Sequence, residues 1–294
     1  KGEYEKNVMK VLNGQEGLIE HDLLTLEEMN KAPFPYYDKN IYNKYFDGNP
    51  IPMNKLTPQA HILTSRGCPF KCIFCVWPAA MTGNDPDGEG KRSVRQYSSD
   101  YIEAFLDNLT SEYKFEAIYF DDDTFNIGNK HTEKISRVAG KYNIPWFAMC
   151  RADTCRQESW KIMKDNGCKG VKIGIESGSQ YVVDKIVNKH LDLKYTQNLV
   201  DHLRNIGMTV HGTFTYGLPG ETKEQMLETK KFIANTNFNT VQESGTAEIE
   251  GTPLHTLNKK ELKNYPGASL NQDYDRQKDG GKKWQSLIQS LQDN

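Results

Sequence analysis

The sequence has little of what marks a membrane, secreted or nucleic-acid-binding protein. It contains no apolar run approaching the roughly 20 residues that a membrane-spanning helix requires, and its start does not resemble a secretory signal peptide. Lysines and arginines form no run, and the formal net charge of -2 gives no basic footprint for a nucleic acid. Six cysteines among 294 residues are too few for a disulfide scaffold. We therefore expect a cytoplasmic protein in a reducing environment, with no membrane span and no nucleic-acid partner.

Three regions of the chain differ in composition. Residues 1–54 include four prolines between positions 33 and 52, which favours an N-terminal extension or linker. Because the chain begins at Lys1 rather than at a methionine, we expect its natural start to lie upstream. Residues 55–252 carry regular secondary-structure patterns and are predicted to form the core domain. Residues 253–294 turn polar and are predicted to form a tail with one short helix, Lys283–Leu291.

Short apolar runs alternate with stretches of helical periodicity throughout the predicted core. This alternation is typical of βα units, in which a helix connects neighbouring parallel strands. A closed eight-fold barrel needs about 250 residues, whereas the core offers only about 200, so we predict an α/β fold, an open partial (β/α)6 TIM-like barrel of parallel strands. The chemistry of such folds lies at the carboxyl ends of the strands. The expected strands are His61–Ser65, Ala117–Phe120, Trp146–Cys150, Val171–Ile175, Thr209–Tyr216 and Thr240–Ser244, and the expected helices are Asp100–Glu112, His131–Tyr142, Glu158–Asn166, Tyr181–Val187, Tyr195–Ile206 and Lys223–Ala234.

Three cysteines crowd into eight residues directly after the first expected strand. Cys68, Cys72 and Cys75 are separated by three and then two residues, so a tight loop can point three thiolates at one centre. Thiolates are soft ligands that suit zinc or an iron–sulfur cluster. A cubane cluster with three cysteine ligands leaves one iron open to a substrate or cofactor. The alternative is a structural zinc site, which needs a fourth ligand from elsewhere in the chain. The residues considered for that fourth ligand are Cys150, Cys155 and His61.

This cysteine motif, with Phe74 immediately before its third cysteine, resembles that of the radical S-adenosylmethionine superfamily. The resemblance extends over roughly residues 57–252 and is closest to the branch that often carries an N-terminal cobalamin-binding domain. It implies a four-iron four-sulfur cluster on the three cysteines, and reductive cleavage of S-adenosylmethionine to a 5′-deoxyadenosyl radical that abstracts hydrogen from a substrate. The further segments that carry the resemblance are Ile118–Phe125, Arg151–Asp153, Asn166–Cys168, Gly174–Ser179 and Gly217–Thr222.

The resemblance also implies which side chains contact S-adenosylmethionine. Asp122 or Asp123 is expected at its amino group, and Arg151 at its carboxylate or paired with an acid such as Glu176. Each residue has a structural alternative: a solvated turn for the aspartates, a rim salt bridge for Arg151, and a helix cap near Glu176. The full set of expected cofactor-binding residues is Phe74, Trp77, Asp122, Asp123, Arg151, Glu176, Ser177 and Gly217.

The first residues of the chain resemble the exit from a cobalamin-binding domain, although the motif of that domain is absent from the sequence. If cobalamin is supplied by a domain outside this chain, the resemblance implies methyl transfer to a small-molecule substrate. The alternatives are a cyclisation or rearrangement without cobalamin, a non-catalytic metal- or cluster-binding module, and a degenerate scaffold. An enzyme of this kind also requires an electron donor, which we expect to be a reductase or a flavodoxin- or ferredoxin-type protein.

Overall fold

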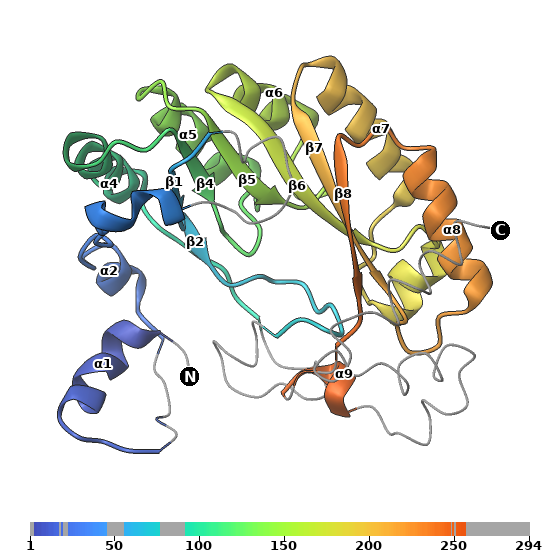
Figure 1. The fold of residues 1–294 in the computed structure, drawn as a ribbon, viewed down its shortest axis with the longest axis horizontal. Helices are drawn as coiled ribbons and strands as arrows, with labels where there is room; N and C mark the ends of the chain where they lie inside the picture. The colour runs from blue at the N-terminus through green and yellow to red at the C-terminus, as the bar shows by residue number, and fades with distance from the viewer. Residues whose placement is uncertain are drawn as a thin grey trace.

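The computed structural model describes residues 3–17, 19, 23–45, 56–76, 92–247, 249 and 251–256. Its centre is a six-stranded sheet with the strand order β1-β4-β5-β6-β7-β8, and every neighbouring pair in it is parallel. The sheet curves into an open half-barrel, and helices lie along its outer face (Figure 1). The two edge strands β1 and β8 do not pair with each other among the described residues, so the predicted open α/β barrel is confirmed. The strands are β1 Gln59–Ile62, β4 Ala117–Phe120, β5 Trp146–Cys150, β6 Cys168–Glu176, β7 Thr209–Tyr216 and β8 Thr240–Gly245.

Local sequence signals account for most of the outer helices. Thr222 and Gln225 form the capping box that opens α8, in which the Thr222 hydroxyl accepts from the Gln225 amide. Gly207 ends α7 at a φ of 78°, a conformation that glycine adopts without steric cost. All four residues of β4 are buried, as expected of a parallel strand that is covered on both faces. The helices are α4 Ser99–Glu112, α5 Asn129–Gly140, α6 Gln157–Asp165, α7 Leu193–Asn205, α8 Lys223–Ala234 and the four-residue α9 Pro253–Thr256.

The first strand differs from its expected position. Strand β1 ends at Ile62, whereas the predicted strand continued to Ser65. The chain leaves the sheet there because Ser65–Arg66 form a separate short strand, β2, which pairs antiparallel with β3, Arg95–Gln96. A second difference is the predicted helix Tyr181–Val187, which is one π-helical turn, η3, over Val182–Ile186.

The N-terminal extension packs onto the half-barrel. It contains α1 Tyr4–Leu12, α2 Leu26–Met29 and the 3₁₀ helix η1 Lys39–Lys44. Leu24, Met29 and Tyr37 are buried in the same hydrophobic cluster as the sheet. The part of the predicted linker up to residue 45 that the structure describes is therefore joined to the core by packed side chains. The expected tail helix Lys283–Leu291 lies outside the described residues.

None of the described helices combines the length and apolar character needed to cross a membrane.

Candidate functional site

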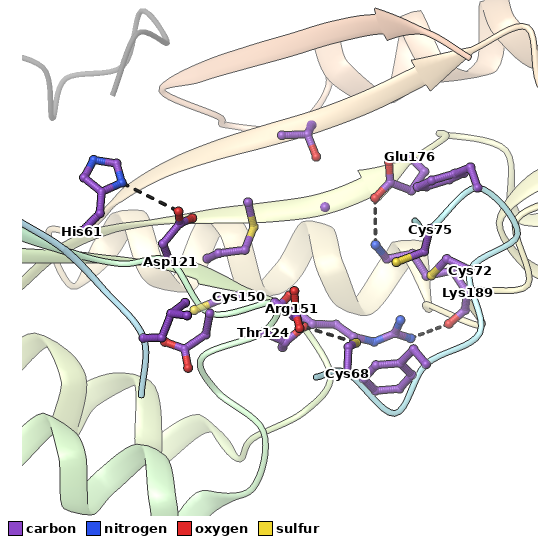
Figure 2. A pocket seen from close by; sticks show the side chains of 18 of the residues that line it. His61, Cys68, Cys72, Cys75, Asp121, Thr124, Cys150, Arg151, Glu176 and Lys189 are labelled. Carbon is purple, nitrogen blue, oxygen red and sulfur yellow. Dashed lines mark hydrogen bonds and ion pairs between the residues drawn. The ribbon is translucent and has the colours of Figure 1, made fainter. Parts of the chain in front are cut away.

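A cavity of about 470 Å³ opens at the carboxyl ends of β1, β4, β5, β6 and β7 (Figure 2). This is the end of the half-barrel at which a parallel βα fold gathers its functional side chains. All three cysteines of the predicted cluster motif line one part of the cavity, and His61 and Asp121 line another part of it. The expected residues Phe74, Asp122, Asp123, Arg151 and Glu176 also line it.

The backbone of the cysteine loop forms hydrogen bonds with three other segments. The Ile73 amide donates to the Val187 carbonyl at 3.0 Å, and the Leu254 amide donates to the Ile73 carbonyl at 3.0 Å. At the start of the loop, the Gly67 amide donates to Asp123 Oδ2 at 2.9 Å. Gly67 has a φ of 90°, and a Cβ there would lie 2.4 Å from the Ser93 carbonyl oxygen, so glycine is required at this position.

The other three cysteines are buried free thiols. Cys150 lines the cavity, but Cys155 and Cys168 are not among its lining residues. Burial raises the pKa of the Cys155 thiol to about 12, as expected of a cysteine that behaves as a small hydrophobic side chain. Across the described ranges, no three or more His, Cys, Asp or Glu side chains are arranged to hold a single metal ion. Cys68, Cys72 and Cys75 are among these side chains, so this finding does not separate a cluster site from the alternative zinc site with Cys150, Cys155 or His61 as a fourth ligand.

Asp122 lines the cavity, and its two carboxylate oxygens differ in their hydrogen bonds. Its Oδ1 accepts hydrogen bonds from the Thr64 amide at 3.0 Å, the Thr64 hydroxyl at 3.0 Å and the Ser65 hydroxyl at 2.5 Å. Its Oδ2 is buried and has no hydrogen-bond partner among the described residues. Because the side chain is buried, the pKa of Asp122 is raised to about 6. A buried oxygen without a hydrogen bond destabilises the folded protein. Asp122 Oδ2 is therefore a candidate acceptor for a bound amino group.

Asp121 and Asp123 flank this residue in different surroundings. Burial raises the pKa of Asp123 to about 6, although its hydrogen bond from the Gly67 amide opposes the shift. Asp121 is about half exposed, and its Oδ2 lies 3.7 Å from His61 Nδ1. Of the three consecutive aspartates, only Asp122 therefore has a fully buried oxygen that lacks a partner.

Lys189 is a cavity residue that the sequence did not reveal. Its Nζ lies 2.8 Å from Glu176 Oε1. Although burial lowers it, the pKa of Lys189 is raised overall, because the Glu176 carboxylate stabilises the ammonium form. Asn188 and His190 on either side have φ values of 59° and 53°, so the loop turns sharply around Lys189. A single lysine between two turn residues follows no periodic pattern, and no sequence signal could have identified it.

Glu176 is held in a strained conformation beside a glycine. Its φ is 75°, a value that is rare for residues other than glycine, asparagine and aspartate. Its Oε2 accepts a hydrogen bond from the Thr215 hydroxyl at 3.2 Å. A Cβ on Gly174 would lie 2.6 Å from Glu176 Oε1 and 3.0 Å from Lys189 Nζ, so a side chain at position 174 would displace the ion pair.

Arg151 connects three parts of the site. Its Nε and Nη2 donate to the two carboxylate oxygens of Asp153 at 2.5 and 3.0 Å, so its ionic partner is Asp153 rather than Glu176. Nη2 also donates to the backbone carbonyl of Lys189. Its guanidinium carbon lies 3.8 Å from the centroid of the Phe70 ring, which belongs to the cysteine loop. Arg151 thus joins the cysteine loop to the loop that carries Lys189.

The remaining expected residues lie in varied places. Phe74 lines the cavity and packs against Val182, Val187 and Leu218. Ser177 is buried, with its hydroxyl 3.0 Å from that of Thr229 on α8, and it does not line the cavity. Gly217 is also absent from the lining, and its amide donates to Glu221 Oε2 at 2.7 Å. Trp77 lies outside the described residues.

Comparison with known proteins places this geometry in context. The family described as the Radical SAM superfamily matches residues 62–233. The chain is 31% identical over 232 residues to an uncharacterised methyltransferase, PH0819, of Pyrococcus horikoshii, covering 78% of this chain and 47% of that protein. It is 27% identical over 240 residues to the cytidylyl-2-hydroxyethylphosphonate methyltransferase of Streptomyces wedmorensis, covering 77% of this chain and 43% of that protein. The chain therefore spans less than half the length of these two relatives.

Solved structures share the fold. The radical S-adenosylmethionine methyltransferase TsrM from Kitasatospora setae, solved with cobalamin and a [4Fe-4S] cluster bound, aligns with a TM-score of 0.58 and 19% identity. That alignment covers 67% of this chain and 38% of TsrM. Methylornithine synthase, PylB, aligns with a TM-score of 0.51 and 14% identity over 85% of this chain and 70% of its own. At these identities the likeness establishes the fold alone.

Proposed function

This chain belongs to the Radical SAM superfamily, and from that membership we propose that it is an enzyme that uses a [4Fe-4S] cluster to cleave S-adenosylmethionine reductively. We further propose that the radical so produced takes hydrogen from a small-molecule substrate, and that the outcome is a methyl transfer linked to cobalamin. The observation that carries the proposal is that three loop cysteines line one cavity together with Asp122, which has a buried carboxylate oxygen without a partner among the described residues.

The residues present fit both cofactors. Cys68, Cys72 and Cys75 offer three thiols from one loop, which is the ligand set of a cubane with one open iron. Burial raises the pKa of the Cys72 thiol, while the nearby Lys189 ammonium opposes that shift. Bound iron favours the thiolate over the thiol, as metals do for any coordinating cysteine.

The charged groups of the cavity suit the methionine part of S-adenosylmethionine. We propose Asp122 Oδ2 as the acceptor for an N–H of its amino group, because that oxygen is buried without a donor among the described residues. We propose that the Lys189 ammonium pairs with the carboxylate of S-adenosylmethionine, and that Glu176 holds the lysine side chain in position. Asp123, and Glu176 through its second oxygen, are further acceptors for amino or ribose hydroxyl donors.

We propose separate roles for the other five expected contact residues. Phe74 provides an apolar wall at the cysteine side for the adenine ring, with Trp77 as its proposed companion. Ser177 and Gly217 do not line the cavity, so their contribution is to fix the turns that follow β6 and β7. Arg151 acts through Lys189 and Phe70, since two of its nitrogens are already bonded to Asp153 and the Lys189 carbonyl.

When bound, the cluster and S-adenosylmethionine supply the one-electron cleavage that yields methionine and a 5′-deoxyadenosyl radical. The chain's own residues would orient the sulfonium relative to the cysteine loop by holding the amino and carboxylate groups of the methionine part. The helices outside the sheet and the buried core beneath the cavity exclude water from one side of it. In a site of low dielectric, such fixed charges act more strongly on the bound cofactor than they would in water.

The methyl-transfer outcome is supported by the names of the relatives, two of which are methyltransferases. We propose that cobalamin is supplied by a domain outside this chain, that a reductase or a flavodoxin- or ferredoxin-type protein delivers the electron, and that the reaction takes place in the cytoplasm. We also propose the division into an extension (1–54), a catalytic core (55–252) and a tail (253–294).

Anaerobic reconstitution with iron and sulfide tests the proposal. We expect the brown protein to release 5′-deoxyadenosine from S-adenosylmethionine after reduction, and Cys72→Ala to lose both colour and product. Cys168→Ala is the matched control, because Cys168 is buried away from the cavity. One zinc per chain with no acid-labile sulfide would instead favour the non-catalytic module.

A further inference from the structure

Two arginines face each other at the base of the cysteine loop. Arg66 in β2 and Arg95 in β3 are directly paired across the antiparallel ladder. This ladder has only two residues in each strand, and it closes the chain between 67 and 94, which carries all three cluster cysteines. Like charges directly opposite each other destabilise a strand pair. The ladder that closes the cysteine loop therefore needs a compensating anion.

Glu3 supplies that anion from the N-terminal extension. Its Oε1 lies 2.6 Å from Arg95 Nη2 and 3.3 Å from Arg66 Nη1, and its side chain has no exposed surface. Its Oε2 accepts from Arg95 Nη1 at 2.9 Å and also from the Leu24 amide. One buried carboxylate thus bonds to both arginines and to the segment before α2. The two guanidinium groups lower the pKa of Glu3 against the opposing effect of burial, so the carboxylate is ionised at neutral pH.

The neighbouring contacts each involve one of the two arginines, whereas Glu3 forms ion pairs with both. Among the described residues, the ion pair of Glu5 is with Arg66, at 2.5 Å, and Glu5 is partly exposed. Arg66 Nε donates to the Tyr97 hydroxyl at 2.9 Å, and Arg95 Nη1 donates to the Leu24 carbonyl at 2.7 Å. Among the described residues, Glu3 is the acid within ion-pair distance of both arginines.

We propose that Glu3 is a positioning residue for the cluster, which locks the base of the cysteine loop by neutralising Arg66 and Arg95 together. Cys68 follows Arg66 by two residues, so a shift of β2 away from β3 moves the first ligand relative to the other two. The N-terminal extension then contributes to the cluster site by fixing the base of the cysteine loop. The measurements of iron content and of the cluster spectrum rest on the proposed function. The measurement of thiol reactivity is made on the apo protein and does not depend on the cluster.

Glu3→Gln keeps the size of the side chain and removes its charge, and Glu27→Gln is the matched control. Glu27 makes an exposed ion pair with Lys31 in the same extension. In the apo protein we expect the loop thiols of Glu3→Gln to react with an aromatic disulfide reagent at least about tenfold faster than in wild type, because breaking a buried ion pair is strongly destabilising. After reconstitution we expect at least half of the iron and sulfide to be lost, and the electron paramagnetic resonance spectrum of the remaining cluster to broaden. The control should match wild type in all three measurements.

A second variant separates positioning from general misfolding. In Glu3→Gln/Arg95→Gln, one of the two facing positive charges is removed together with the anion. The reaction rate of the loop thiols and the iron content should therefore both return towards the wild-type values. If Glu3→Gln alone fails to fold, recovery in the double variant still supports the proposal, and failure to recover overturns it. Wild-type thiol kinetics and iron content in Glu3→Gln would also overturn it. If wild type takes up no cluster, the proposed function fails, and the thiol kinetics alone decide the role of Glu3.

Discussion

The ammonium group of Lys189 lies 2.8 Å from a carboxylate oxygen of Glu176, and both side chains are about nine-tenths buried. The two residues come from opposite ends of the connection that contains η3, so their pairing fixes the path of the chain between β6 and α7. Burying either charge alone would destabilise the folded protein far more than burying the two as a pair.

This pair predicts a strong asymmetry between single and double substitutions. Lys189→Met should lower the free energy of unfolding by about 3 kcal/mol, because it leaves the Glu176 carboxylate buried and unpaired. Lys189→Met/Glu176→Gln should recover much of that loss. Urea denaturation of the four proteins in a double-mutant cycle measures the coupling, and additive effects would show that the ion pair contributes nothing. Isothermal titration should also show weaker S-adenosylmethionine binding in both Lys189 variants, since neither retains the cation.

A second prediction concerns Asp122. Asp122→Asn retains the size of the side chain but replaces a carboxylate with a neutral amide. The dissociation constant for S-adenosylmethionine should rise by about tenfold to a hundredfold, the loss expected for a charge-assisted hydrogen bond between a carboxylate and an amino group. Asp121→Asn, on the half-exposed neighbour, should change affinity much less. Equal affinities for wild type and Asp122→Asn would remove Asp122 from the binding site.

Arg151 is predicted to be irreplaceable by lysine. Lysine cannot reproduce the paired bonds to Asp153, the bond to the Lys189 carbonyl and the stacking on Phe70. Arg151→Lys should therefore weaken S-adenosylmethionine binding and also alter the resonance spectrum of the reduced cluster. Arg156→Lys is the control, because Arg156 also makes a two-nitrogen contact, to Glu133, but on the exposed rim. An Arg151→Lys protein that matches wild type in both measurements would contradict its linking role.

Glu221 makes stability depend on pH. Burial raises its pKa to about 7 from an ordinary value of 4.5, so the folded protein holds a proton that the unfolded chain releases. The stabilising effect of that proton is complete below about pH 4.5 and is lost as the pH rises towards 7. The loss amounts to at most about 3 kcal/mol. Glu221→Gln should therefore have a flatter profile of unfolding free energy against pH than wild type between pH 5 and 7.5, measured by urea denaturation across that range.

The control for this profile is Glu228→Gln, an exposed residue of α8. Its curve should run parallel to that of wild type. If the Glu221→Gln curve also runs parallel, the buried carboxyl group does not hold its proton in the folded state.

Much of the fold could be predicted from the sequence because its signals are local. The expected strands Ala117–Phe120, Trp146–Cys150 and Thr209–Tyr216 match β4, β5 and β7 to the residue. Apolar runs, helix caps and terminal glycines each act within a few residues, so they can be read without knowing the tertiary structure. The same reasoning placed the three cysteines and the three aspartates at one edge, where parallel strands have their carboxyl ends, whereas the choice of Asp122 or Asp123 came from the family resemblance.

The missed features depend on contacts between distant parts of the chain. Strand β2 pairs with β3 across almost thirty residues with only two residues in each, which leaves no periodic pattern. The N-terminal prolines suggested a linker, yet Glu3 is buried by arginines 63 and 92 positions away. Lys189 and Asp153 were missed because the identity of an ion-pair partner depends on tertiary geometry. Such pairings carry no local signature, and only the folded chain reveals them.

The most direct test of the central claim is electron–nuclear double resonance on the reduced, reconstituted protein with S-adenosylmethionine labelled with nitrogen-15 at its amino group. The account predicts a hyperfine coupling between the labelled nitrogen and the cluster, present in wild type and lost in Cys72→Ala. A well-formed cluster that shows no coupling to the label, with its fourth iron bound by a protein side chain, would contradict it.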